Sequence, residues 1–175
     1  MWRGISLNIK YITLGAIFAA IAALFQLVPN FFSEMFVLMT VFSALPIYII
    51  SRINPKTGVV AYVVADFMVM LLSVHEGLLF LFTNGIIGLT LGICNYYIKQ
   101  KSIIWIISST TLIVSLCLVN YGIGIPVFGG DLPGKIGLQL SILSGFSLVY
   151  NIIFYYVSGF IYHRLEKLGF IDKIN

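Results

Sequence analysis

The sequence predicts an all-α membrane protein, a six-transmembrane-helix bundle with both termini cytoplasmic. Three observations lead to this prediction. Of the 175 residues, 60% are hydrophobic and only 9% are charged, whereas a soluble domain carries roughly a quarter charged residues. The apolar residues fall into runs of about 18 or more, which is long enough for a helix to cross a bilayer. The basic residues lie in the gaps between these runs, where they set the orientation of a membrane protein.

The first half of the chain contains three apolar runs. We expect the first helix at 11–28, followed by Pro29-Asn30, a pair that stops helices. The second helix is expected at 34–51, and the polar segment 52–56 separates it from the third, which is expected at 57–73.

The second half gives three more helices. His75-Glu76-Gly77 is expected to form a tight turn before the fourth helix, 78–98, and Lys99-Gln100-Lys101 separates that helix from the fifth, 102–121. The segment 122–137 is rich in Gly and Pro and is expected to be a loop. The sixth helix is expected at 138–162, before a short charged tail. The whole chain, 1–175, is then a single integral membrane domain, and its runs are too long for the strands of a β-barrel.

The distribution of charge predicts the orientation of the bundle. If both ends are cytoplasmic, nine of the ten basic residues lie in the segments on the cytoplasmic side of the membrane, and Lys135 is the exception. Such an asymmetry is typical of membrane proteins with an even number of helices. Because the basic residues form no single patch, the net charge of +4 does not indicate nucleic-acid binding. The nine inside residues are Arg3, Lys10, Arg52, Lys56, Lys99, Lys101, Arg164, Lys167 and Lys173.

Several function classes lack their sequence signatures. The chain contains no zinc-protease motif, no Walker A loop and no nucleophile elbow. Cys94 and Cys117 lie inside apolar runs without the spacing of metal ligands, so we interpret them as packing residues. We therefore expect no enzymatic activity, no cofactor and no metal site.

A face of small residues runs along the first predicted helix. Residues at spacings of three and four share one face of a helix, and small side chains allow two helices to approach closely in lipid. This face either packs against another helix of the same chain or docks on another protein. It consists of Gly15, Ala16, Ala19, Ala20 and Ala23.

Asp66 is the one charged residue predicted to lie deep in a membrane span. A charge at this depth is costly, so we expect Asp66 to face the interior of the bundle. Three interpretations remain open: coupling to protons or cations, contact with a substrate, and a structural hydrogen bond to another helix.

Polar residues also gather at the outer halves of the last three predicted helices and in the adjoining loops. Convergent polar groups among aromatic side chains are typical of a small-molecule pocket, whereas an ordinary solvated outer loop is the alternative. The candidate substrate-binding residues are Glu76, Asn84, Asn120, Tyr121, Asp131, Gln139 and Ser144.

The length, the layout and the first helix together resemble the S components of energy-coupling factor (ECF) transporters. These S components are the substrate-binding membrane subunits of bacterial vitamin importers, and they carry an Ala-x-x-x-Ala motif in helix one. Ala16 and Ala20 supply this motif here, and Ala19 and Ala23 repeat it in a second register. The resemblance implies a multi-pass protein of the bacterial plasma membrane that captures a vitamin or micronutrient on its outer face. It also implies that helix one docks on a transmembrane coupling subunit that carries two ATPase subunits.

Two alternatives come from other function classes. The chain also resembles rod-shape-determining membrane proteins of the MreD type, which act as scaffolds for cell-wall synthesis, because Asp66 precedes the segment 73–78 in a similar arrangement. The third interpretation is a small ion-coupled carrier that uses Asp66. An outer polar pocket distinguishes a receptor from a scaffold, which needs none.

Overall fold

The structure is a computed structural model that describes residues 9–32, 34–126 and 133–169. All regular structure within these residues is helical. Five helical segments are long and apolar enough to cross a membrane: Ile9–Phe31, Pro55–Leu72, Val74–Tyr97, Lys101–Ile123 and Ile136–Lys167. A further apolar helical segment, Leu38–Ile53, is shorter.

The first two predicted helices differ from the observed ones in where they end and whether they are continuous. Helix α1 (Ile9–Phe31) continues through Pro29, because a proline in the last turn removes only one backbone hydrogen bond. The second predicted helix, 34–51, is divided into a 3₁₀ turn η1 (Glu34–Phe36), a short helix α2 (Leu38–Phe42) and helix α3 (Ala44–Ile53).

Polar caps define the next two helices. Helix α4 (Pro55–Leu72) begins with Pro55 in its first turn, and the side chain of Asn54 accepts a hydrogen bond from the backbone N–H of Thr57. Helix α5 (Val74–Leu79) begins in the same way, because Ser73 accepts from the N–H of Glu76. The prediction of a tight turn at 75–77 was therefore wrong, and these residues form the first turn of α5.

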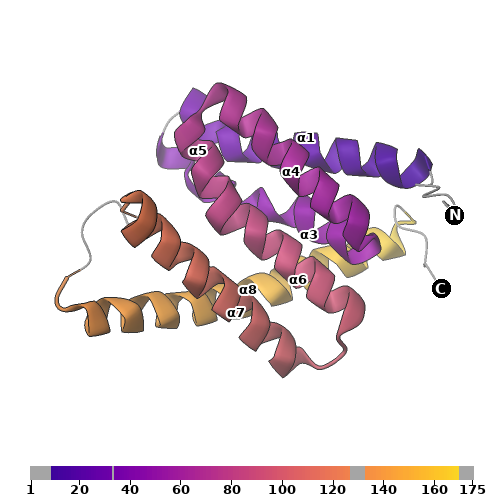
Figure 1. The fold of residues 1–175 in the computed structure, drawn as a ribbon. Helices are drawn as coiled ribbons and strands as arrows, with labels where there is room; N and C mark the ends of the chain where they lie inside the picture. The colour runs from indigo at the N-terminus through magenta and orange to yellow at the C-terminus, as the bar shows by residue number, and fades with distance from the viewer. Residues whose placement is uncertain (1–8, 33, 127–132, 170–175) are drawn as a thin grey trace, which may run out of the picture.

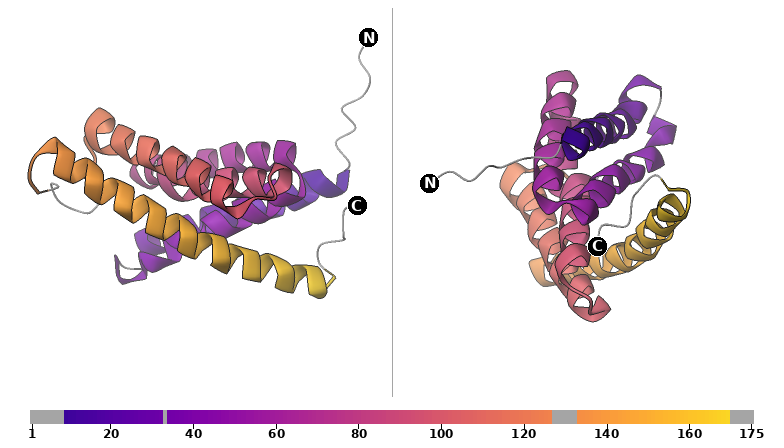
Figure 2. Two further views of the ribbon diagram at one scale, coloured as in Figure 1. Left: turned by 90° about the horizontal axis from the view of Figure 1, so that it is seen from below. Right: turned by 90° about the vertical axis from the view of Figure 1, so that its right-hand side faces the viewer.

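The remaining helices include two π-helical segments. A π-turn η2 (Phe80–Asn84) joins α5 to α6 (Gly85–Tyr97), and a second one, η3 (Leu118–Ile123), extends α7 (Lys101–Cys117). The last helix, α8 (Ile136–Lys167), has 32 residues and is therefore about 48 Å long at 1.5 Å per residue. It exceeds the thickness of a bilayer core, about 30 Å, and Figure 2 shows it running along the whole bundle.

The long segments lie side by side in alternating directions (Figure 1). The start of α1 and the end of α8 lie at one end of the bundle, and α5 and the start of α8 lie at the other. All described basic residues except Lys135 belong to the starts of α1, α4 and α7, the ends of α3 and α8, or the α6–α7 connection. The bundle therefore has a basic end and an opposite end that carries Lys135, His75 and Glu76.

Helices α3 and α6 share the most extensive helix contact in the described part of the chain, and they meet through glycines of α6. A Cβ atom built on Gly88 would lie 2.3 Å from the carbonyl oxygen of Ala44, and one built on Gly92 would lie 2.5 Å from Cβ of Ser51. Glycines spaced by four residues lie on one helix face, so this face brings the two backbones into contact, as small residues commonly do in membrane helices.

Helix α3 is also fixed to α8 at the basic end of the bundle. The guanidinium of Arg52 lies 3.9 Å from the centre of the Tyr162 ring, and its Nη1 donates a 2.7 Å hydrogen bond to Tyr48 Oη. Large apolar side chains on the outward faces remain exposed, among them Phe67 (62%) and Val149 (56%). A membrane solvates such side chains directly, whereas water does not.

Candidate functional site

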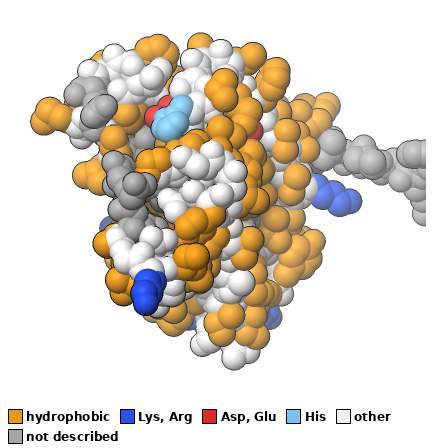
Figure 3. Space-filling model, turned by 60° about the vertical axis from the view of Figure 1, so that its left-hand side comes forward, with side chains coloured by type: hydrophobic (Ala, Val, Ile, Leu, Met, Phe, Trp, Pro, Cys, Tyr) orange, Lys and Arg blue, Asp and Glu red, His pale blue; other side chains and the backbone are white. Residues whose placement is uncertain are grey.

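A pocket of about 890 Å³ opens at the end of the bundle that is opposite the basic end. It lies between the C-terminal turns of α1, helix α2, the α5–η2 segment and α7, and the first half of α8 closes one side. Hydrophobic side chains cover most of this face of the molecule, and acidic and histidine side chains lie together on it (Figure 3).

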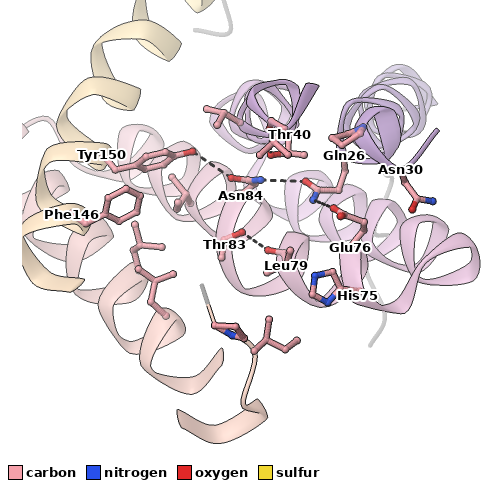
Figure 4. Close-up of a pocket in the computed structure, with 18 of the residues that line it drawn as sticks. Gln26, Asn30, Thr40, His75, Glu76, Leu79, Thr83, Asn84, Phe146 and Tyr150 are labelled. Carbon is pink, nitrogen blue, oxygen red and sulfur yellow. Dashed lines mark hydrogen bonds between the residues drawn. The ribbon is translucent and has the colours of Figure 1, made fainter. Parts of the chain in front are cut away.

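A chain of hydrogen bonds crosses one wall of the pocket (Figure 4). Gln26 Nε2 donates to Glu76 Oε2 at 2.8 Å, and Gln26 Oε1 accepts from Asn84 Nδ2 at 3.2 Å. Asn84 Oδ1 in turn lies 3.4 Å from the hydroxyl of Tyr150. The hydroxyl of Ser43 lies 3.0 Å from Gln26 Oε1. Side chains from α1, the start of α3, α5, η2 and α8 thus meet in one connected group.

Along this chain from Glu76 to Tyr150 the two amides are the most buried members, and Tyr150 at its far end is half-buried. Glu76 is half-buried, whereas Gln26 is 1% exposed and Asn84 is 9% exposed. Polar side chains buried this deeply are costly unless they are hydrogen-bonded. The connected group meets this requirement, and it holds the two amides in fixed positions.

The π-turn η2 places Asn84 in the wall of the pocket. The backbone N–H of Gly85 donates to the carbonyl of Phe80, five residues earlier, which is the spacing of a wide turn. Two neighbouring carbonyls accept from other helices: Leu81 from Tyr62 Oη at 2.6 Å, and Phe82 from Ser115 Oγ at 2.5 Å. These bonds fix η2 to α4 and α7. Such wide turns occur frequently at functional sites.

Apolar side chains form another part of the pocket lining. Ile87, Leu112 and Leu116 line the pocket and are at most 3% exposed, and Phe146 of α8 lies beside Tyr150 with ring centres 5.6 Å apart. An apolar lining that includes a few oriented polar groups is the usual construction of a site for a small organic molecule.

The structure brings together only part of the predicted binding set. Glu76 and Asn84 line the pocket. Exposed Tyr121 and half-buried Gln139 lie outside the pocket lining, joined by a 2.7 Å hydrogen bond from Tyr121 Oη to Gln139 Oε1. Ser144 does not line the pocket either. Its hydroxyl donates a hydrogen bond to the carbonyl of Leu140 within its own helix.

Asn120 is half-buried in η3 and is also absent from the lining of the pocket. Asp131 lies outside the described residues. Helical geometry explains why some predicted residues line the pocket and others do not. Residues at the same end of a bundle still point in different directions around their helix axes.

Sequence reasoning missed Gln26, Ser43 and Tyr150. Gln26 interrupts an otherwise apolar stretch of α1, and a lone amide in a membrane helix is the kind of signal that could have identified it. Ser43 marks the division between α2 and α3, where its hydroxyl lies 2.6 Å from the carbonyl of Thr40. Tyr150 carries no comparable signal, because tyrosines are frequent in α8.

The predicted small-residue face of α1 is divided between two environments. Ala19 and Ala23 are buried within the chain at 0% and 2% exposure, and α1 packs there against α4. Ala16 is exposed and Ala20 is half-buried, so these two lie on the outward side.

Asp66 is buried in α4, with 8% of its surface exposed. Its Oδ1 atom has no hydrogen-bond partner within the described part of the chain. It does not line the pocket, so the structure keeps this carboxyl apart from the Gln26–Asn84–Glu76 group.

Comparisons of this chain with protein-family models, with curated proteins and with solved structures gave no match.

Proposed function

We propose that this chain is the substrate-capturing membrane subunit of an ECF-type importer for a vitamin or related micronutrient. The observation that carries the proposal is the 890 Å³ pocket, with its buried polar chain, at the end opposite the basic residues. Because basic residues mark the cytoplasmic side of a membrane protein, the pocket opens to the outside. A receptor that captures a nutrient needs its site there.

The same orientation places both termini in the cytoplasm. The five long segments and Leu38–Ile53 would then make six crossings. The outward strip of α1 that contains Ala16 and Ala20 would dock on the coupling subunit. Ile17 (51% exposed) lies beside this strip, and Leu24 (68% exposed), four residues after Ala20, extends it toward the C-terminal half of α1. Two ATPase subunits bound to the coupling subunit would supply the energy for release of the nutrient inside the cell.

The proposal is tested by native mass spectrometry of the protein purified in detergent from its own cells. We expect a bound small molecule together with a coupling subunit and two ATPases. Asn84→Leu keeps the branched shape of the side chain but removes its polar atoms, so it should lose the small molecule. Ser144→Ala is the matched control and should retain it. Cell-wall synthesis proteins without a small molecule would instead establish the scaffold function.

The docking surface has its own test. Ala16→Trp should abolish co-purification of the coupling subunit and leave the thermal unfolding temperature unchanged, because Ala16 is exposed. Ala19→Trp should destabilise the chain itself, because Ala19 is fully buried. Co-purification that survives Ala16→Trp and Ala20→Trp would exclude this surface.

A further inference from the structure

The Glu76 carboxylate determines which groups donate and which accept along the hydrogen bonds in the pocket wall. A carboxylate can only accept hydrogen bonds, so Gln26 must present its NH₂ group to Glu76 Oε2, at 2.8 Å. Gln26 Oε1 therefore points the other way, and Asn84 must present its own NH₂ group to it, at 3.2 Å. The orientation of both amides follows from the single charge on Glu76.

This arrangement uses one N–H donor of each amide within the wall and leaves acceptor oxygens at the pocket. Asn84 Oδ1 faces the Tyr150 hydroxyl at 3.4 Å, a long hydrogen bond. An amide oxygen has two lone pairs and a carboxylate has about four. Asn84 Oδ1 and the Glu76 carboxylate therefore keep the capacity to accept hydrogen bonds from a ligand.

The charged residues around the pocket also favour a ligand that is not anionic. Glu76 and His75 are the ionisable acid and base that line it in the described part of the chain, and no lysine or arginine there contributes to the lining. Lys135, the described basic residue at this end, is exposed at the start of α8 and is not a lining residue. An anionic ligand would therefore meet the Glu76 carboxylate, which repels it, without a lysine or arginine among the described lining residues to offset that charge.

The apolar wall completes the description of the ligand. Ile87, Leu112 and Leu116 are buried apolar residues of the pocket lining. A molecule that fills the pocket would place a ring or hydrocarbon part against them and direct its polar head toward Glu76 and Asn84.

We infer that the pocket selects small amphipathic molecules whose polar head is a protonated amine or a similar cationic hydrogen-bond donor. Glu76 would bind the head directly, Asn84 Oδ1 would accept a second hydrogen bond, and Gln26 would position both. The inference rests on the proposed function, since it names the class of molecule that the same pocket captures.

Three indole compounds with the same ring and the same two-carbon chain provide the test: tryptamine (cationic), tryptophol (neutral) and indole-3-propionate (anionic). Their binding to the purified protein is measured at pH 8 by native mass spectrometry and by thermal shift. We expect tryptamine to bind at least about tenfold more tightly than the other two, because hydrogen bonds to charged groups contribute about 1.5–3 kcal/mol.

Two variants separate the site from general charge effects. Glu76→Gln keeps an oxygen that can accept from Gln26 but removes the charge, so the preference for tryptamine over tryptophol should disappear. Glu166→Gln is the matched control. This residue lies at the basic end, where its carboxylate is 3.2 Å from His163 Nδ1, and its loss should leave the preference unchanged.

The outcomes distinguish this inference from the proposed function. Tighter binding of indole-3-propionate, or an anionic molecule co-purifying in the pocket, would overturn the inference and leave the receptor function standing. A tryptamine preference that persists in Glu76→Gln would also overturn the inference. A protein that co-purifies with no small molecule and binds none of the three compounds would overturn both.

Discussion

Replacing Gly88 by alanine tests the close approach of helices α3 and α6. The new Cβ atom would lie 2.3 Å from the carbonyl oxygen of Ala44, 3.1 Å from its carbonyl carbon and 3.3 Å from its Cα. Ordinary contacts begin at 3.4 Å, so the first of these distances is about 1 Å too short. The obstacle is backbone, and no side-chain rotation can relieve it. Helices α3 and α6 must therefore move apart.

Overpacking of this kind typically costs about 1–3 kcal/mol, and a backbone obstacle places Gly88→Ala near the upper limit. In a chain of this length, each kcal/mol corresponds to about 2–4 °C in unfolding temperature. We therefore expect a fall of about 6–12 °C. Gly145→Ala is the matched control, because a Cβ there meets nothing within 4 Å. It should raise the stability by up to about 1 kcal/mol through helix propensity.

The assay is thermal unfolding in detergent, followed by the reaction of Cys94 with a fluorogenic thiol reagent. Cys94 lies on α6 and is 6% exposed, so its reactivity reports the opening of this helix interface. Cys117→Ser removes the second thiol from all samples. If Gly88→Ala unfolds at the same temperature as Gly145→Ala, the close approach of α3 and α6 is incorrect.

Three further predictions concern other contacts. Arg52→Lys should lower the unfolding temperature, because a lysine cannot both stack on the Tyr162 ring and reach Tyr48 in the same geometry. An unchanged unfolding temperature would argue against this contact. Ser115→Ala should cost about 1 kcal/mol in the unfolding free energy, because the hydroxyl bonded to the Phe82 carbonyl is lost. Asp66→Asn should leave the retention of the small molecule in native mass spectrometry unchanged, because Asp66 does not line the pocket. Loss of the molecule would favour an ion-coupled carrier.

The helical class and most of the helix positions could be predicted because they depend on local properties of the sequence. Long apolar runs with few charges must become helices in lipid, where each backbone polar group needs an internal partner. The five long segments confirm this expectation. The distribution of basic residues likewise predicted which ends of the helices lie together, and Figure 1 places these ends at the same side of the bundle.

The division of the predicted second helix could not be found in this way. The residues on both sides of Ser43 are apolar, so composition indicates one continuous run. The hydroxyl of Ser43 lies within reach of both the Thr40 carbonyl and Gln26, and only the packed structure provides the second of these partners.

The candidate site was decided by tertiary structure. From the sequence, Glu76 and Asn84 were predicted for the pocket, because both were expected at the outer side of the helix bundle. Gln26, which connects them, is 58 residues from Asn84 along the chain, and Tyr150 is 66 residues from it. Hydropathy reports the depth of a residue in the membrane. The rotation of each helix about its axis, which decides which polar side chains meet, is set by the packing of small residues such as Gly88 and by the wide turn at Asn84.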